Sequence, residues 1–311
     1  MLLTMATDST GHLRVCTFAG ASSLPLFIAL ERDFFATQGL VVDLVGTRSS
    51  KELMEGLLDK SFTVVHAAPD NFIAWRDRTA APIVAWIGGT SGPVRLVAAP
   101  DVTDIKDLRG REIAVDAPES GFVSVLRKIL RQAGVSDQEI SLQAIGATNL
   151  RFDALREGRT AATMLTLPWS AIAEEEGFKP LADQRDVLPR LQGSCAASLE
   201  PWLTDHSDSA DAYLRALVTA LTWAYMPANG DAVRKLLASR YEVDPSRAEA
   251  VRRAILDPND GWPPSAFIDP EGMESVCQLR TENGMAPQEP ASAYYTLEPY
   301  RRVFGFGRVQ G

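Results

Sequence analysis

Cysteine and histidine are the side chains of this sequence best suited to act as nucleophile, base or metal ligand, and each type occurs three times. The cysteines are Cys16, Cys195 and Cys277, and the histidines are His12, His66 and His206. They form no CxxC, HExxH or HxH spacing, which argues against a zinc ribbon, a disulfide-stapled small fold and a histidine-built metal site. We therefore expect no metal and no cofactor. The odd number of cysteines agrees loosely with a reducing compartment.

One catalytic arrangement stays open, a nucleophile and base formed by Cys16 and His66. Cys16 lies inside an apolar segment and His66 near the end of another. The two could act together only if both side chains face one cleft. The simpler interpretation is a buried, unreactive thiol for Cys16 and a hydrogen-bonded, partly buried ring for His66.

The chain is acidic, with 31 Lys and Arg against 40 Asp and Glu, a formal charge of −9 and a pI near 5.0. Nucleic-acid binders neutralise phosphates with a positive surface, so a genome-binding role is not expected. The 311 residues are 46% apolar and 23% charged, which excludes a disordered chain. This length fits one large α/β domain or two domains of ordinary size.

Apolar periodicity predicts two blocks in which strands alternate with helices. In the first block the predicted strands are 13–18, 40–45, 62–67 and 83–87, and the helices are 24–36, a segment that begins at a Ser49 capping box, and 71–76. In the second block the predicted strands are 95–98, 112–116, 141–145 and 161–165, and the helices are 123–132 and 151–157. The chain after about residue 198 is helical. This alternation predicts βαβ crossovers, mainly parallel sheets and two lobes.

In parallel α/β sheets, ligands bind beyond the carboxyl ends of the strands, where helices begin. In the first block this rule selects a set of polar side chains in the loops after three strands. They are Ser22, Ser23, His66, Asp70, Asn71, Thr90 and Ser91. Ser22 and Ser23 are also candidate helix caps, and Asp70 and Asn71 are candidate N-caps of the helix that follows.

In the second block the strongest anion-binding candidate is Ser120-Gly121-Phe122, because glycine admits a ligand to the backbone and serine adds a hydroxyl. A plain helix cap explains Ser120 equally well. The neighbouring Glu119 would compete with an anion. Thr166 follows another predicted strand of this block.

Two arginines and two tryptophans lie near these loops. Arg95 or Arg151 could hold a carboxylate or sulfonate, although solvated surface arginines are the simpler interpretation. Trp86 and Trp169 are core residues by default.

Five stretches in order resemble one protein family. They are "SSLPLFIALERDFFATQGLVVDLV", "VVHAAPDN", "VAWIGGTSGPVRLVAAPDVTDIKDLRGREIAV", "SGFVSVLRKILRQAGV" and "ALREGRTAATMLTLPWSAIAEEEGF". The order resembles the SsuA/NMT1-like substrate-binding proteins of ABC importers for nitrate, sulfonates, taurine and thiamine-precursor pyrimidines. Trp169 lies where the family has a cleft loop with tryptophan and proline, although the order here is Pro168-Trp169.

The resemblance implies a type II periplasmic-binding-protein fold with two crossover strands. Lobe 1 is then residues 1–93 plus 199–311, and lobe 2 is residues 94–198. A small anionic or heteroaromatic ligand (sulfonate, carboxylate or pyrimidine-like) would be trapped between them by hinge closure, for delivery to an ABC permease. A monomer is expected.

An enzyme on the same fold is the alternative, of the desulfinase, decarboxylase or pyrimidine-synthase kind. Cys16 and His66 would then be its catalytic residues. The chain has no signal-peptide pattern at its start and no transmembrane stretch, so the sequence as written predicts a cytoplasmic protein. A protein from which a leader has been removed would be periplasmic.

Overall fold

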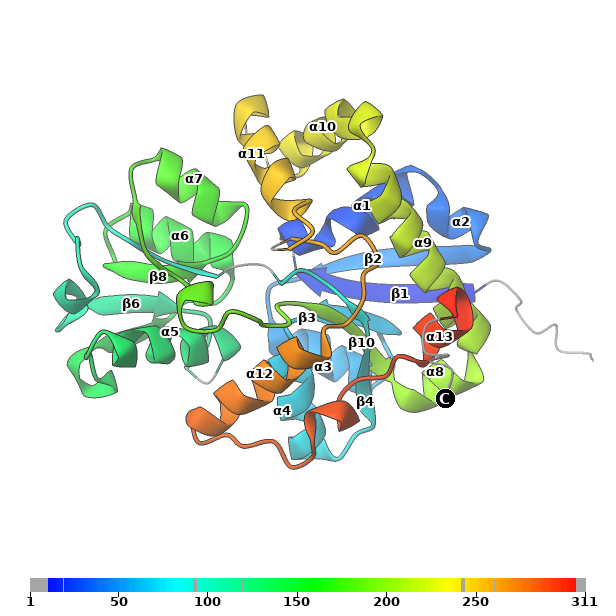
Figure 1. The fold of residues 1–311 in the computed structure, drawn as a ribbon, viewed down its shortest axis with the longest axis horizontal. Coiled ribbons are helices and arrows are strands. Elements are labelled where there is room, and N and C mark those ends of the chain that lie inside the picture. Colours follow the sequence, from blue (N-terminus) through cyan, green and yellow to red (C-terminus); the bar gives the residue numbers. More distant parts are fainter. Residues whose placement is uncertain are drawn as a thin grey trace, which may run out of the picture.

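Two five-stranded sheets form the centres of two lobes in the computed structural model, which describes residues 11–18, 20–91, 94–118, 120–241, 244–259 and 261–305. The lobes lie side by side (Figure 1). The predicted two-lobed α/β fold is therefore confirmed. The residue limits given above for each lobe stay a prediction.

The first sheet has the strand order β2-β1-β3-β10-β4. Its strands are β1 Gly11–Phe18, β2 Leu40–Thr47, β3 Val64–Ala67, β4 Ile83–Gly88 and β10 Cys195–Leu199. β1 runs parallel to β2 and β3, whereas β10 runs antiparallel to β3 and β4. The chain thus already belongs to the first sheet at Cys195, ahead of the predicted return at 199.

The second sheet has the strand order β7-β6-β8-β5-β9. Its strands are β5 Arg95–Ala98, β6 Glu112–Val115, β7 Ser141–Ala144, β8 Ala162–Leu165 and β9 Lys179–Asp183. β6 runs parallel to β7 and β8, and β5 runs antiparallel to β8 and β9.

Both sheets are mixed, and in each sheet four strands run in one direction while one, β10 or β5, runs against them, so the prediction of mainly parallel sheets is confirmed. The sequence analysis overlooked β9 and β10, and the antiparallel pairings of these strands depend on a long-range return of the chain. β10 reads Cys-Ala-Ala-Ser-Leu, a run without β-branched residues that becomes a strand because it is buried between β3 and β4.

Helices cover both faces of each sheet (Figure 1). Around the first sheet they are α1 Leu24–Glu31, α2 Phe34–Thr37, α3 Ser50–Leu58 and α4 Pro69–Thr79, and around the second they are α5 Gly121–Gln132, α6 Thr148–Arg156 and α7 Trp169–Glu175. The C-terminal helices are α8 Glu200–Asp205, α9 Ser207–Tyr225, α10 Gly230–Tyr241, α11 Pro245–Ile255, α12 Pro270–Glu282 and α13 Glu298–Phe304.

Two local predictions show how tertiary contacts modify helix ends. The single helix predicted over 24–36 is two helices, because Asp33 adopts a left-handed conformation with φ of 55°. The break turns Phe35 against Tyr213 of α9, with ring centroids 5.2 Å apart. The predicted cap of α3 is confirmed, since Ser49 Oγ accepts a hydrogen bond from Glu52 N at 3.3 Å. Glu52 does not complete the box, because its carboxylate accepts from Thr47.

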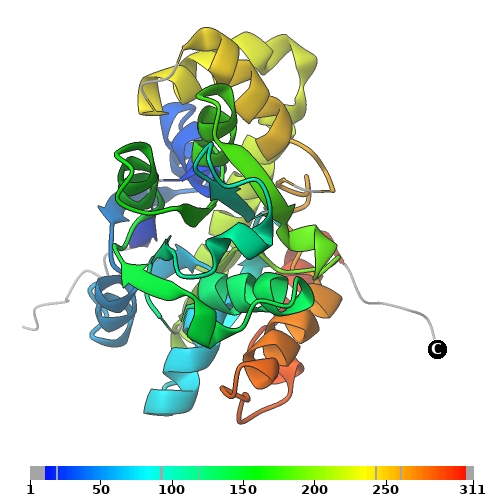
Figure 2. The same cartoon turned by 90° about the vertical axis from the view of Figure 1, so that its left-hand side faces the viewer.

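Apolar clusters hold the helices to both faces of the sheets. One cluster joins α1 and α9 to the first sheet, and a second joins α3, α4 and α12 to its opposite face. A third packs α5 against the second sheet and includes Leu279 of α12. α12 therefore contributes to the cores of both lobes. In Figure 2, α11 lies near the top of the molecule and α12, in orange, near its lower side. Within the described part of the chain, no helix has the length and apolar character needed to cross a membrane.

Candidate functional site

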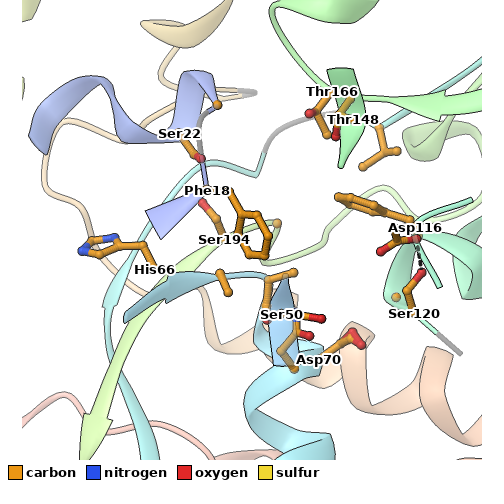
Figure 3. A pocket seen from close by; sticks show the side chains of 18 of the residues that line it. Phe18, Ser22, Ser50, His66, Asp70, Asp116, Ser120, Thr148, Thr166 and Ser194 are labelled. Carbon is orange, nitrogen blue, oxygen red and sulfur yellow. Dashed lines mark hydrogen bonds between the residues drawn. The ribbon is translucent and has the colours of Figure 1, made fainter. Parts of the chain in front are cut away.

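A cleft of about 1460 Å³ lies between the lobes and is lined by residues of both. The starts of α3, α4, α5, α6 and α7 contribute to its walls, each after the carboxyl end of a strand. Figure 3 shows Ser22, Ser50 and Asp70 on one side, and Thr148 and Thr166 on the other. The strand-end rule that selected candidate residues from the sequence thus identifies the cleft.

The two serines in the loop after β1 have different environments. Ser22 lines the cleft. Ser23 is fully buried, donates its hydroxyl to the Phe18 carbonyl at 2.8 Å and lies 2.8 Å from the Thr17 hydroxyl. Ser23 therefore holds the loop in shape and is absent from the cleft wall, contrary to the expectation.

The loop after β3 places three candidate residues at the cleft. His66 lines it only in part, because its Nε2 lies 2.9 Å from the Tyr213 hydroxyl and the ring points away from the other labelled side chains (Figure 3). Burial lowers the pKa of His66 to about 3, so the ring is neutral and offers no positive charge to a ligand. Asp70 and Asn71 also line the cleft. They lie in the first turn of α4, whose N-cap is Ala68, so the predicted capping role is wrong.

The two segments that connect the lobes pass each other at the back of the cleft. Thr90 lines the cleft, and its amide donates to Ser194 Oγ at 2.9 Å while the Ser194 amide donates to the Thr90 carbonyl at 2.9 Å. A Cβ at Gly193 would lie 2.7 Å from the Thr90 carbonyl oxygen, so only glycine permits this approach. Ser91 donates to the carbonyl of Asn259 at 2.8 Å and does not line the cleft, which corrects its prediction.

Two protein carboxylates, Asp116 and Asp70, lie at the start of α5. Ser120 is the N-cap of α5, accepting from Val123 N at 3.2 Å, and it donates its one proton to Asp116 at 2.5 Å (Figure 3). Gly121 faces Asp70 from the other lobe, because a Cβ there would lie 2.5 Å from Asp70 Oδ1. Ser120 and Gly121 line the cleft as predicted, but two carboxylates oppose an anion at this helix start. Glu119 lies outside the described residues.

The start of α6 has the opposite electrostatic character. Arg151 is 1% exposed, and its guanidinium donates to Thr148 Oγ1 at 3.1 Å, to the Met164 carbonyl at 3.0 Å and to the Gly146 carbonyl. All three acceptors are neutral, and Nε has no hydrogen-bond partner. Phe122 lies under the guanidinium, whose carbon is 5.7 Å from the ring centroid. Arg151 is thus buried at the cleft and is not a solvated surface arginine.

Burial lowers the pKa of Arg151, while the nearby charge of Asp116 opposes that change. Arg95 forms ion pairs with Glu174 and Asp183 and does not line the cleft.

Aromatic side chains form part of the wall in the second lobe. Phe122 and Trp169 both line the cleft, as does Thr166. Trp169 begins α7 and packs against Phe152, with ring centroids 6.3 Å apart. Trp86 is a core residue, fully buried, with its indole donating to Ser198 at 3.1 Å. As ligand contacts, the lining residues stay predictions.

The proposed Cys16 and His66 pair is not formed. Cys16 is fully buried, belongs to the apolar cluster with α3 and α4, and does not line the cleft. Burial raises the pKa of its thiol to about 12, which leaves no thiolate near neutral pH. His66 is bonded to Tyr213 instead. Among the residues that the structure describes, no group of three or more metal-ligating side chains occurs.

Several lining residues were not selected from the sequence. The strand-end rule, applied also to β2, β6 and β7, would have identified one group: Thr47, Ser49, Ser50, Asp116, Thr148 and Asn149. Others come from the C-terminal helices, where no sequence signal was available: Arg240, Tyr241, Val276, Leu279 and Arg280.

The charges around the cleft differ in sign from the chain as a whole. Within the described part of the wall, the cationic side chains are Arg48, Lys51, Arg78, Arg151, Arg240 and Arg280. The acidic ones are Glu55, Asp70 and Asp116. The wall is thus net positive in a chain of formal charge −9.

Comparison with solved structures agrees with this architecture. The alkanesulfonate-binding protein SsuA from Xanthomonas axonopodis pv. citri, bound to MOPS, has a TM-score of 0.76 at 17% identity, covering 94% of this chain and 100% of that chain. The periplasmic nitrate-binding protein NrtA from Synechocystis PCC 6803 has a TM-score of 0.78 at 14% identity, covering 97% and 90%. The desulfurization enzyme DSZB has a TM-score of 0.69 at 15% identity, covering 95% and 99%. At these identities the likeness concerns the fold.

Sequence comparison gives a family. The bicarbonate transport ATP-binding protein CmpC from Synechococcus elongatus is 24% identical over 250 residues, covering 70% of this chain. The aligned region spans only 36% of CmpC. The model of the NMT1-like family matches residues 7–238. With the two-lobed fold and the cleft between its lobes, this match shows that the chain belongs to the NMT1-like family.

Proposed function

We propose that this protein is the solute-binding component of an ABC importer and captures a small anion by closing its two lobes. The observation that carries the proposal is the net positive cleft between two lobes in a chain of formal charge −9. Local cations and helix N-termini can hold an anion against an unfavourable net charge. Relatives named for bicarbonate, nitrate and alkanesulfonate support this ligand class.

Arg151 is the residue that we assign to the anionic group of the ligand. The buried guanidinium is hydrogen-bonded only to neutral oxygens, and the nearby Asp116 acts on it without a hydrogen bond, so a carboxylate, sulfonate or oxyanion could still pair with it directly. Thr148 is the first residue of α6, and the helix dipole at this N-terminus also favours a negatively charged group. Phe122 and Trp169 provide an apolar wall for the rest of the ligand.

A thermal-shift panel tests the ligand class. The panel contains bicarbonate, nitrate, short alkanesulfonates, an aromatic carboxylate and a neutral pyrimidine, with chloride as ionic-strength control. At about 100 times Kd, a ligand that binds only the native protein stabilises it by about 2.7 kcal/mol. We expect one class of anion to raise Tm. A shift with the pyrimidine alone would contradict the anion proposal in favour of a heteroaromatic ligand.

Turnover would contradict the binding function. Any stabilising ligand is incubated with the protein and followed by mass spectrometry, and we expect it to be recovered unchanged. Conversion that Cys16→Ala abolishes would instead establish the enzyme alternative. The buried position and raised pKa of this thiol argue against that result.

A permease and a periplasmic location complete the proposal. SsuA from Escherichia coli and NrtA from Synechocystis PCC 6803 are named as periplasmic binding proteins, and SsuA from Methylobacillus flagellatus KT is named with a sulfonate ABC transporter, which supports both parts of the proposal. Cell fractionation tests the compartment. Stimulation of a reconstituted importer's ATPase by the loaded protein tests the partner.

A further inference from the structure

Three helices, α4, α5 and α12, meet at one edge of the cleft. α4 belongs to the lobe of the first sheet and α5 to the lobe of the second. Asp70, in the first turn of α4, lies against Gly121, which begins α5. A Cβ at Gly121 would lie 2.5 Å from Asp70 Oδ1, so the carboxylate and the helix start are in direct contact. α12 contacts both α4 and α5 and links to the latter through Lys128 and Glu282, 2.8 Å apart. Any rotation of one lobe against the other changes this junction.

Polar atoms are concentrated at the junction without partners. Among the described residues, Ser124 Oγ and Arg280 Nε are buried without a hydrogen-bond partner, and Asp70 Oδ1 has at most the amide of Gly121. Asp70 is 8% exposed, Ser124 1% and Arg280 7%. Buried polar groups are nearly always hydrogen-bonded, so this junction is not fully satisfied in the arrangement that the structure shows.

The charged groups facing Asp70 come from two elements. Arg280 Nη1 on α12 lies 3.7 Å from Asp70 Oδ2, beyond hydrogen-bonding distance. Asp116, after β6, brings a second negative charge from the opposite lobe. Burial is the main cause that raises the pKa of Asp70 to about 6, and Asp116 adds to the rise. Arg280, which also donates to the Asp70 carbonyl at 3.4 Å, and the Gly121 amide oppose it.

We propose that Asp70 takes up a proton when the lobes close, so that this junction is a pH-sensitive latch on the cleft. Closure buries Asp70 beside the negative charge of Asp116, and both effects favour the neutral carboxyl over the charged one. In the open arrangement Asp70 leaves α5 and faces water, where ionisation is favourable. Closure and ligand capture are therefore stronger at mildly acidic pH. The inference rests on the proposed function only in taking lobe closure as the binding motion.

The expected size follows from linkage. With a pKa of about 6 when closed and the ordinary 3.8 when open, the closed-to-open ratio rises about tenfold between about pH 7.5 and about pH 5. The same factor applies to the affinity of any ligand that requires closure, provided that the ligand does not itself titrate in this range.

The interlobe distance measures closure without any ligand. Spin labels are attached at Ser239→Cys on α10 and Gln143→Cys on β7, both exposed positions, while the native cysteines are buried. Double electron–electron resonance is recorded across the pH range. We expect the short-distance population to grow about tenfold relative to the long one as pH falls from about 7.5 to about 5.

Variants assign the effect to Asp70. Asp70→Asn, which keeps the shape without the titration, should make the distance distribution independent of pH. Glu157→Gln, which removes an exposed carboxylate paired with Arg159 outside the cleft, should keep the wild-type response. Gly121→Ala should favour the long distance at every pH, because its Cβ would meet Asp70. Far-ultraviolet circular dichroism confirms that each variant is folded.

Two results would overturn the latch: a wild-type distance distribution that does not change with pH, or an unchanged pH response in Asp70→Asn. Neither depends on finding a ligand. Failure of the ligand panel with a pH-dependent distance would refute the proposed function alone, and ligand binding with an invariant distance would refute the latch alone.

Discussion

The starts of α5 and α6 lie in the same wall of the cleft, yet they offer a ligand opposite environments. At α5, Asp116 takes the Ser120 hydroxyl proton and Asp70 presses on Gly121. At α6, none of the carboxylates that the structure describes is hydrogen-bonded to the terminus, and Arg151 is buried behind it. Both helices have the same dipole, so the difference comes from side chains supplied by other elements.

This difference teaches how to interpret a serine and a glycine before a helix. The Ser120-Gly121 pair is the stronger anion-binding signal in the sequence, but in the folded protein its donors are used for the cap and for contact between lobes. The N-cap of α6 is Ala147, whose side chain cannot cap a helix, so the sequence carries no signal of an anion site at this position. A helix terminus binds an anion only where its field is not already met by protein carboxylates.

We expect the largest effect from removing the buried arginine at the start of α6. Arg151→Gln leaves the carbonyls of Gly146 and Met164 without their donor and should lower the free energy of unfolding by about 1–3 kcal/mol for each of them. It should also abolish the thermal shift caused by the stabilising anion. Arg156→Gln is the matched control on the same helix, because Arg156 pairs with Glu176 outside the cleft. An equal loss of the ligand shift in both variants would contradict the assignment.

The next effect concerns pH and the α5 side. The raised pKa of Asp70, about 6 against the ordinary 3.8, means that the folded protein binds its proton more tightly, so this group adds up to about 3 kcal/mol of stability as pH falls through that window. His66 acts oppositely. Its pKa falls to about 3 from 6.5, so the unfolded chain binds the proton more tightly and stability is lost as pH falls from 6.5.

Urea unfolding from about pH 7 to about pH 4 separates these two contributions. In Asp70→Asn, we expect a steeper loss of stability on acidification than in the wild type, because the opposing contribution of Asp70 is removed. In His66→Gln, the loss should be shallower than in the wild type, because the unfolded chain no longer binds a proton at this position. Identical slopes in the wild type and Asp70→Asn would show that Asp70 has its ordinary pKa in the folded protein.

We expect smaller effects from removing one hydroxyl at the start of α5 or of α6, and comparing these two variants tests where the anion binds. Ser120→Ala removes the side-chain cap of α5 and the donor to Asp116, and should cost about 1 kcal/mol of unfolding free energy. Anion affinity should change little, because we place the ligand at α6. Thr148→Ala serves as the counterpart, with a similar cost in stability but a weaker ligand shift. Calorimetry on both variants measures the two quantities. A larger affinity loss in Ser120→Ala would reverse the assignment.

The smallest effect tests the limits of the cleft. Ser91→Ala removes one hydroxyl bond to the Asn259 carbonyl and should change the ligand shift by less than the error of the assay. Ser22→Ala, the comparison variant, removes a hydroxyl that lines the cleft. Equal ligand shifts in the wild type and both variants would show that Ser22 is not a ligand contact.

Periodicity in the sequence was enough to predict eight of the ten strands, because each carries apolar or β-branched residues in a local run. β9 and β10 were missed since their pairing depends on the return of the chain rather than on their own composition. Of the twelve ligand-contact candidates, only Ser23 and Ser91 fall outside the wall. The residues absent from the prediction are chiefly those of α10 and α12, which reach the cleft from distant parts of the chain.

The sequence by itself determined the two α/β blocks, the family and the loops that face the cleft, because strand ends and helix starts are local properties of the chain. The tertiary structure alone decided which hydroxyls remain free, where Arg151 is buried and which carboxylates meet α5. Burial, and with it the pKa of Asp70, the neutrality of His66 and the inertness of Cys16, arises from neighbours far apart in sequence. Electrostatic environment is therefore a property of the assembled lobes, and no spacing of residues encodes it.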